Sequence, residues 1–301
     1  KKEMTNSSNK YILMVIAAVL LSACSITKKN ERPATLATDK LYRDQASADS
    51  TTIADMPWQS VFKDEKLNAL IQRGLNNNLN LKNAIENIIQ AQASLRQSKL
   101  AYYPTLNLEG SVNRNKQSKA GLNFPPGIDI NTLTTTYRLG LSTSWEADIW
   151  GKLSSSKRAA LASYLATDAA KQAVQTQLIA DIANNYFLLL AYDKQLKITE
   201  ETLETRVKGV ETIKALKEGA IVTGAAVVQS EANLHAAEVL IPDIKRSIRE
   251  TENALNILLG QAPAPIERGE LETQTVPENL AVGLPSQLLQ NRPDVREAEY
   301  N

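Results

Sequence analysis

Three groups of side chains in the sequence are of types that could carry out chemistry: a single cysteine, a single histidine and a pair of carboxylates. Cys24 is the only cysteine and His235 the only histidine, so the chain can form neither an intramolecular disulfide nor a metal site built from several cysteines and histidines. His235 falls on the solvent side of a seven-residue hydrophobic repeat, where no catalytic or ligand role is expected. Glu146 and Asp148 are two positions apart in a stretch of alternating polarity, so they share a face of a predicted strand and superficially resemble paired catalytic carboxylates. No phosphate loop, dinucleotide fingerprint or serine-triad motif accompanies them, and the sequence does not predict an enzyme.

Cys24 follows an apolar run of ten residues, 12–21, which is preceded by a lysine. Such a run is too short to span a bilayer but fits the hydrophobic region of an export signal. The segment LSAC is similar to a bacterial lipobox, in which cleavage before the cysteine leaves a thiol that carries diacylglycerol. We therefore predict a lipoprotein signal peptide over residues 1–23, a covalent lipid on Cys24 and no other cofactor or metal. The alternative is a buried or free thiol behind an ordinary signal.

The residues after the cysteine indicate where the chain resides. Ser25 is not the aspartate that retains lipoproteins in the inner membrane of some bacteria, so we expect the outer membrane, with the chain facing the periplasm. Residues 24–56 are polar and are predicted to form an N-terminal tether. The formal net charge of +1 gives no argument for nucleic acid, and no later stretch reaches the eighteen apolar residues of a membrane helix.

Residues 57–104 show helical periodicity twice. In the first segment Asp64 is the predicted N-cap, and Leu67 and Leu75 belong to one apolar face. In the second segment, apolar residues recur every seven positions until Pro104 ends the pattern. They are Leu81, Ile88, Leu95 and Tyr102. We therefore predict two periplasmic helices.

The hydrophobic period changes to two in residues 105–149. Two alternating runs occur there, and the second extends from Tyr137 through Trp145 to Ile149. Each run is about the nine to eleven residues that a tilted strand needs to cross a bilayer, so we predict a pair of outer-membrane β-strands joined by an external loop. A half-buried soluble hairpin would show the same alternation. Two strands cannot close into a barrel, and the unpaired backbone groups at an open sheet edge are not tolerated in lipid. Other chains or further residues must therefore complete the barrel.

The predicted strand leads into a helix through a short junction. Glu146 and Asp148 are expected to line a wet interior where the strand meets the helix, and Gly151 and Lys152 mark the junction. Thus the residues predicted for this junction are Glu146, Asp148 and Gly151.

The seven-residue repeat returns in residues 150–260, on both sides of a glycine-containing break at 219–224. A strict repeat of this kind requires left-handed supercoiling, which predicts a long periplasmic α-hairpin of two antiparallel coiled-coil helices. Pro242 is expected to interrupt and bend the second helix. A strut or conduit across the periplasm needs such a shape, whereas a globular enzyme core does not.

The last residues repeat an earlier segment. NRPDVREAEYN at 291–301 matches NNLNLKNAIEN at 77–87, and the apolar residues that precede the two copies agree. We therefore predict a linker over residues 261–283 and the start of a truncated second repeat over residues 284–301. The complete reading frame is expected to continue with another strand pair and another helical hairpin.

Four segments resemble signature segments of the outer-membrane efflux proteins, the family of TolC and OprM, in its lipoprotein branch. They are WQSVFKDEKLNALI, SWEADIWGK, ENALNILLGQAP and LPSQLLQNRPDVREAE. The resemblance covers residues 58–301 in the family's order. It implies a homotrimer in which each subunit contributes four strands to one shared barrel, with a periplasmic adaptor protein and an inner-membrane pump of the resistance-nodulation-division (RND) class as partners. The chain departs from the family in lacking the second strand pair and hairpin, and in lacking an acidic gating residue just after the glycine of the hairpin turn.

The turn of the hairpin is the predicted docking site for the adaptor, because apolar side chains occur there in place of the usual polar ones. The residues of this tip are Gly219, Ala220, Ile221, Val222, Thr223 and Gly224. The alternative is that Ile221 and Val222 fold back to plug the end of the coiled coil.

Taken together, the patterns and the resemblance predict a mainly α fold with membrane β. It consists of a long antiparallel coiled-coil hairpin plus two transmembrane β-strands of an oligomeric barrel, as in a TolC-like outer membrane factor. The expected function is that of a channel subunit in a tripartite RND-type efflux system, a passive duct in contact with outer-membrane lipid. The alternative is a lipid-anchored periplasmic adaptor of an export system, which can also contain a long α-hairpin.

Overall fold

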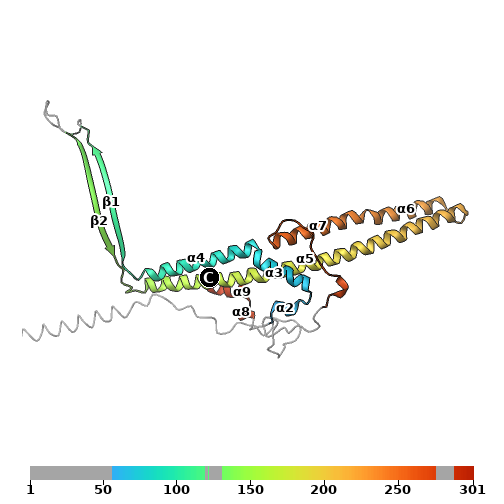
Figure 1. Ribbon diagram of the computed structural model, residues 1–301, viewed down its shortest axis with the longest axis horizontal. Coiled ribbons are helices and arrows are strands. Elements are labelled where there is room, and N and C mark those ends of the chain that lie inside the picture. Colours follow the sequence, from blue (N-terminus) through green and yellow to red (C-terminus); the bar gives the residue numbers. More distant parts are fainter. Residues whose placement is uncertain (1–55, 119–120, 122–130, 276–287) are drawn as a thin grey trace, which may run out of the picture. The chain divides into compact units, whose positions relative to one another are not determined.

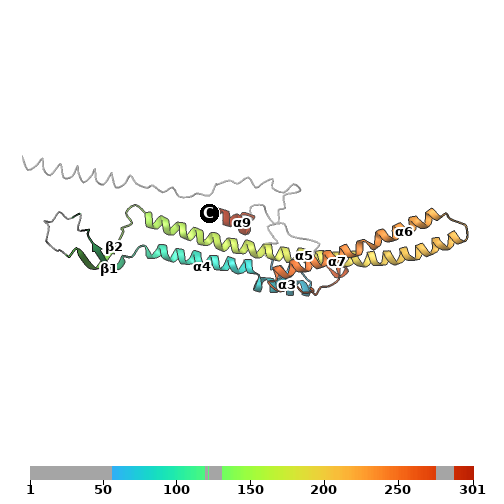
Figure 2. The same ribbon diagram turned by 90° about the horizontal axis from the view of Figure 1, so that it is seen from above.

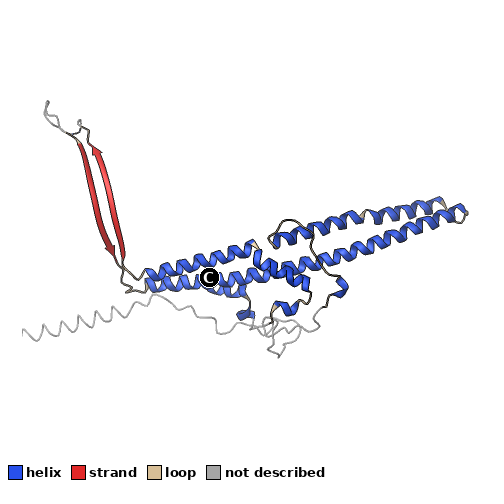
Figure 3. Ribbon diagram, viewed as in Figure 1, coloured by secondary structure: helices blue, strands red, loops and turns tan. Residues whose placement is uncertain are grey.

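The structure is a computed structural model that describes residues 56–118, 121, 131–275 and 288–301. Helices dominate the described residues (Figure 3). The elements are α2 (Trp58–Val61), α3 (Glu65–Asn77), α4 (Leu79–Leu100), β1 (Thr105–Lys116), β2 (Leu133–Ser144), α5 (Lys152–Glu218), α6 (Gly224–Glu238), α7 (Leu240–Leu258), the 3-10 helix η3 (Leu271–Thr273), α8 (Leu288–Asn291) and α9 (Pro293–Tyr300). The predicted signal peptide, Cys24 and nearly all of the predicted tether lie outside the described residues.

The chain divides into two compact units, whose boundaries fall within α4 and α5. One unit contains the strands together with the rest of Gln92–Leu161. The other contains α3, most of the helical hairpin and the C-terminal helices. Among the described residues, no helix combines the length and the apolarity that crossing a membrane requires.

The two strands form an antiparallel sheet whose register joins their apolar faces. Leu108 pairs with Leu141, and Val112 pairs with Tyr137. Directly paired residues point to the same side of a sheet, so the alternate apolar residues of both strands form one continuous face. Both faces are exposed along nearly the whole length, and Leu139 is 81% exposed. The predicted alternation is therefore confirmed over these two strands.

The prediction that the second strand continues to Ile149 is wrong, because β2 ends at Ser144. One step further, the register would place Trp145 opposite Pro104, which has no backbone N–H to donate to the ladder. The indole Nε1 of Trp145 donates instead to the carbonyl oxygen of Tyr102 at 3.1 Å. The chain then turns toward α5 without further strand pairing.

The long hairpin is built from α5, which has 67 residues, and from α6 and α7, which return beside it (Figure 1, Figure 2). At 1.5 Å per residue, α5 is about 100 Å long. The returning helix is interrupted at Val239. Pro242 accounts for the break, because its ring crowds the carbonyl of Glu238 four residues earlier, where α6 ends. The predicted interruption is thus confirmed.

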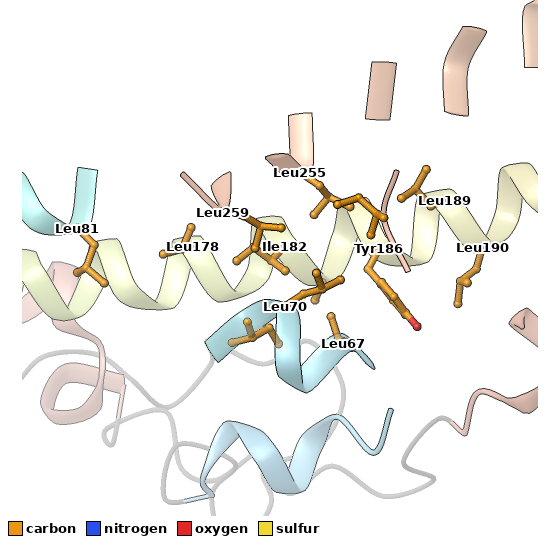
Figure 4. Packing of buried hydrophobic residues seen from close by; sticks show 13 residues of the cluster. Leu67, Leu70, Leu81, Leu178, Ile182, Tyr186, Leu189, Leu190, Leu255 and Leu259 are labelled. Carbon is orange, nitrogen blue, oxygen red and sulfur yellow. The ribbon is translucent and has the colours of Figure 1, made fainter. Parts of the chain in front are cut away.

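The core lies where α3, α4 and α7 meet the middle of α5 (Figure 4). Ile182 of α5 is fully buried, and a Cβ added to Gly74 of α3 would lie 2.4 Å from its Cδ1 atom, so α3 approaches α5 closely. The buried cluster consists of Leu67, Leu70, Ile71, Leu81, Leu178, Ile182, Ala183, Tyr186, Leu189, Leu190, Leu255, Leu259 and Ile266. Leu67 and Leu81 of this cluster belong to the apolar patterns that the sequence predicts for the first two helices, whereas Tyr186 and Ile266 do not.

Asn78, the residue between α3 and α4, connects three helix ends. Its Oδ1 atom accepts a hydrogen bond from the N–H of Leu81 at 2.9 Å, which caps α4. Its Nδ2 atom donates to the carbonyl oxygen of Leu258 at 2.9 Å, which satisfies the end of α7. The hairpin is therefore attached at its base to the break between α3 and α4.

The predicted internal repeat coincides with a repeated helix boundary. α3 ends at Asn77 and α4 begins at Leu79. α8 ends at Asn291 and α9 begins at Pro293, the corresponding positions of the second copy. Pro293 suits the first position of α9, because the backbone N–H that proline lacks would have no partner within the helix at that position.

Candidate functional sites

The tip of the hairpin ends α5 with a Schellman motif. The N–H of Ile221 donates to the carbonyl oxygen of Leu216 at 2.9 Å, and the N–H of Ala220 donates to that of Lys217 at 2.9 Å. Ala220 has a φ of 57°, the left-handed conformation in which glycine is the usual residue. This conformation destabilises the fold by about 1–2 kcal/mol for most residues that carry a Cβ, because the Cβ approaches the following carbonyl oxygen. The glycine of this turn, Gly219, is one position too early to relieve the strain.

The apolar residues of the tip differ in exposure. Ile221 is 71% exposed, whereas Val222 is half-buried. Thr223 occupies the N-cap position of α6, yet its side chain makes no capping hydrogen bond. The fold-back alternative therefore does not describe Ile221, and an uncovered isoleucine side chain remains at the turn.

The strand-helix junction is organised by Asp148, which caps α5. Its carboxylate accepts hydrogen bonds from the N–H groups of Leu153, at 2.8 Å, and Ser154, at 2.9 Å. Burial alone would raise the pKa of Asp148, but these hydrogen bonds outweigh it and lower the pKa. Gly151 supplies the reversal of the chain with a φ of 72°. Asp148 and Gly151 thus start the long helix.

Glu146 makes a separate contact at the same junction. Both of its carboxylate oxygens accept from the Nζ atom of Lys152 at 2.9 Å, and both side chains are exposed. An exposed ion pair of this kind contributes little stability. The prediction that Glu146 and Asp148 share a strand face is wrong, because both lie beyond the end of β2. Their expected position along a wet interior stays a prediction.

A polar network near the middle of α5 is absent from the sequence predictions. The hydroxyl of Tyr186 donates to Asp64 Oδ2 at 2.7 Å and accepts from the N–H of Gly269 at 2.9 Å. Gln274 Nε2 also donates to Asp64 Oδ2, at 2.8 Å. Burial would raise the pKa of Asp64, but the hydrogen bonds from Tyr186, Gln274 and the start of α3 outweigh it and lower the pKa. Burial, with the Asp64 charge adding to it, raises the pKa of the Tyr186 hydroxyl.

Arg268 extends this network to α7. Its Nε and Nη2 atoms donate to the two carboxylate oxygens of Asp193 at 2.5 and 2.9 Å, and its Nη1 atom donates to Glu252 at 2.6 Å. The Arg268 side chain is only 17% exposed, and the Asp193 contact, followed by that of Glu252, raises its pKa. Arg268 therefore joins α5 to α7. We call Arg268, Tyr186, Asp64 and their partners the linker clamp.

Comparison with known protein sequences identifies a family profile and several relatives that the chain matches. A sequence profile described as "Outer membrane efflux protein" matches residues 70–261. The chain is 30% identical over 294 residues to the solvent efflux pump outer membrane protein SrpC of Pseudomonas putida, covering 96% of this chain and 62% of that protein. It is 29% identical over 299 residues to the probable outer membrane lipoprotein SilC of Salmonella typhimurium, with 96% and 62% covered.

The fold has counterparts among solved structures. The outer membrane channel MtrE of Neisseria gonorrhoeae, in its open state, superposes with a TM-score of 0.73 at 28% sequence identity. That match covers 92% of this chain and 60% of the other. The chain thus spans about three fifths of the length of the relatives that it matches.

Proposed function

The chain belongs to the outer membrane efflux protein family, and from this premise we propose that it forms part of a passive duct for export across the periplasm and the outer membrane. One observation carries the proposal. The register of β1 and β2 gathers the apolar residues of both strands on one face and polar residues on the other, and no helix of the described chain covers the apolar face. A strand pair with one side against lipid and one against water needs this arrangement.

The barrel is proposed to be completed by a homotrimer. A two-stranded sheet leaves a row of unpaired backbone groups on each outer edge, which lipid does not satisfy. Three subunits, each adding strands to a shared barrel, would pair these edges. The helical hairpins would then form the periplasmic part. Left-handed supercoiling is favoured by the seven-residue series of α5, in which Ile182, Leu189 and Val210 are buried and the two positions between Leu189 and Val210 are half-buried.

The proposed duct is separated from the adaptor alternative by fractionation of the complete protein. A duct subunit is expected in the outer-membrane fraction as a detergent-soluble trimer whose electrophoretic mobility changes on heating. A monomer extracted from the inner membrane would contradict the duct and favour the adaptor. The profile match and the relatives named above support the duct, because each is described as an outer-membrane protein.

Cys24 is proposed to carry the lipid that anchors the chain to the outer membrane. The lipobox-like segment supports this, and the relative SilC is itself named a lipoprotein. Metabolic labelling with palmitate should mark the wild type, and Cys24→Ser should leave an uncleaved or mislocalised precursor. An unlabelled wild type would end the proposal.

The tip is proposed to receive a periplasmic adaptor, which would connect the duct to an inner-membrane RND-type pump. The exposed Ile221 at a turn supports a partner surface. Ile221→Asp should abolish export and cross-linking to the adaptor while leaving trimers intact. The matched control is Ile198→Asp, a half-exposed isoleucine of α5 away from the tip, which should keep both. Normal export by Ile221→Asp would remove the docking proposal, and failure of that variant to assemble would favour a structural role for the tip.

A further inference from the structure

The charged residues of the strand pair are distributed unevenly between its two faces. The strands contain Glu109, Arg114, Lys116 and Arg138. The register places Arg114 opposite Thr135 and Lys116 opposite Leu133. Because alternate residues share a face, Arg114 and Lys116 continue the line of Val112 on the apolar face, whereas Glu109 and Arg138 belong to the polar face.

Arg114 and Lys116 have no anionic partner among the described residues. Both side chains are exposed, and Glu109, the acidic residue of the strands, points to the opposite face. The polar face is neutral at the same end of the sheet. Its residues there are Asn113, Asn115, Thr134 and Thr136. Basic residues that served only to hydrate the end of the sheet would have no reason to avoid the polar face.

The spacing places these cations at the margin of the apolar band. From Leu106 to Lys116 the strand extends about 34 Å, which at a tilt of about 40° covers about 25 Å along the membrane normal, the height of the apolar band of a membrane strand. Lys116 thus lies at the margin of the band, and Arg114 lies about 5 Å closer to its middle. A cation at mid-bilayer is costly, but near the interface the cost falls to almost nothing, and long basic side chains reach the headgroups. Just beyond the opposite end of the strand pair, the side chain of Trp145 is exposed.

We propose that Arg114 and Lys116 bind the phosphate groups of anionic lipids in the outer leaflet of the membrane. The proposal rests on the proposed function, in which the strands cross the outer membrane with the loop between them outside. A guanidinium presents paired N–H donors that match phosphate oxygens, and the lysine adds a second charge next to it. Two basic residues on the lipid side of one strand end thus form a headgroup site that ties each subunit to the surrounding membrane.

The test uses the complete trimer in neutral detergent, titrated at low salt with headgroup-intact, chain-labelled phosphatidylglycerol. Each cation near a lipid phosphate contributes about 1 kcal/mol, so Arg114→Gln with Lys116→Gln should raise the Kd about thirty-fold. The charge-preserving pair Arg114→Lys with Lys116→Arg should retain most of the binding. The matched control is Arg138→Gln, which removes a cation from the opposite face of the same sheet and should leave the Kd unchanged.

The outcomes separate this proposal from the proposed function. An unchanged Kd in the double glutamine variant, or an equal loss in Arg138→Gln, would overturn the headgroup site. Displacement of the lipid by millimolar inorganic phosphate alone would make it a phosphate-ion site and overturn the lipid assignment. Fractionation is carried out in parallel. A wild type absent from the outer membrane would contradict the duct itself, whereas normal insertion with no lipid preference would leave the duct standing and remove only this inference.

Discussion

The base and the tip of the helical hairpin are built from the same two-helix motif but are stabilised in different ways. At the base, Ile182 and Tyr186 lie in a cluster to which α3, α4, α7 and the segment after α7 all contribute, and the linker clamp adds ion pairs across it. At the tip, only α5 and α6 meet, and Ile221 is exposed. The difference shows that the hairpin is anchored at one end, while the other end leaves the apolar side chain of Ile221 exposed.

Burial along the seven-residue pattern of α5 is uneven. Ile182 and Leu189 are fully buried at the base, Leu196 and Leu203 are half-buried further along, and Val210 is buried again nearer the tip. An apolar side chain that is only half-buried removes less area from water than one in the core at the base. Substitutions at the partly exposed positions of α5 should therefore cost less than substitutions at the base.

The largest effect is expected from Ile182→Ala at the base. Ile182 is fully buried beside Gly74, so truncation should lower the free energy of unfolding by about 2–5 kcal/mol. Ile198→Ala, at a position that is 50% exposed on the same helix, should cost about 1 kcal/mol or less. Denaturant titrations of the two variants measure the contrast. Equal losses at both positions would refute the difference between the base and the more exposed part of the hairpin beyond it.

The linker clamp is expected to contribute the next largest effect. Arg268→Met leaves Asp193 and Glu252 without their cation in a mostly buried position and should cost about 2–4 kcal/mol. The control is Arg246→Met on α7, where the arginine is 67% exposed and pairs only with exposed carboxylates, so the expected change is under about 1 kcal/mol. Thermal unfolding in parallel distinguishes them, and an Arg268→Met protein as stable as wild type would show that the clamp is dispensable.

The clamp also predicts a dependence on pH. Hydrogen bonds to the Asp64 carboxylate lower its pKa below the ordinary value of 3.8, so its contribution to stability is complete above that value and disappears as the pH falls through the lower folded-state pKa. The stability difference between wild type and Asp64→Asn should therefore be largest at neutral pH and shrink below about pH 4. Glu65→Gln at the neighbouring exposed position is the control. A difference that stays constant down to pH 2 would contradict this role for Asp64.

The smallest effect is expected at the tip, and its sign is opposite. Ala220→Gly removes the cost of a left-handed alanine and should raise the local stability by about 0.5–1 kcal/mol after the greater entropy of unfolded glycine is subtracted. Ala226→Gly, within the first turn of α6, should lower it by up to about 1 kcal/mol. Hydrogen exchange at the Ile221 N–H, which the Schellman motif protects, reports both changes. Slower exchange in Ala226→Gly than in Ala220→Gly would refute this account of the turn.

Patterns of short period in the sequence predicted the elements well. Alternation grouped the apolar residues within each strand, although only the register of the structure joined the two groups into one face. Asp64 was recognisable as an N-cap because its carboxylate accepts hydrogen bonds from the N–H groups of Lys66 and Leu67 within the same turn. Such interactions join residues that are close in sequence or obey a fixed period. Pro242 likewise acts on its own helix, so its effect could be predicted locally.

These patterns could not predict contacts between segments that are distant in the sequence. Tyr186 and Asp64 are 122 positions apart, and Arg268 and Asp193 are 75 apart, so no periodicity relates them. The error at the end of β2 has the same origin. The alternation through Trp145 is genuine, but the strand ends because its partner position holds Pro104, a fact that depends on the register of the other strand.

The central claim, that the strand pair has one face toward lipid and one toward water, is tested most directly by cysteine labelling at adjacent positions. Asn107→Cys and Leu108→Cys lie on opposite faces of β1, next to each other in the chain. In intact outer membranes of the complete protein, a water-soluble maleimide should modify the cysteine at 107 and spare the one at 108 until detergent and denaturant are added. Wild type serves as the blank for Cys24. Equal and rapid labelling at both positions, or the reverse preference, would contradict the membrane role of these strands.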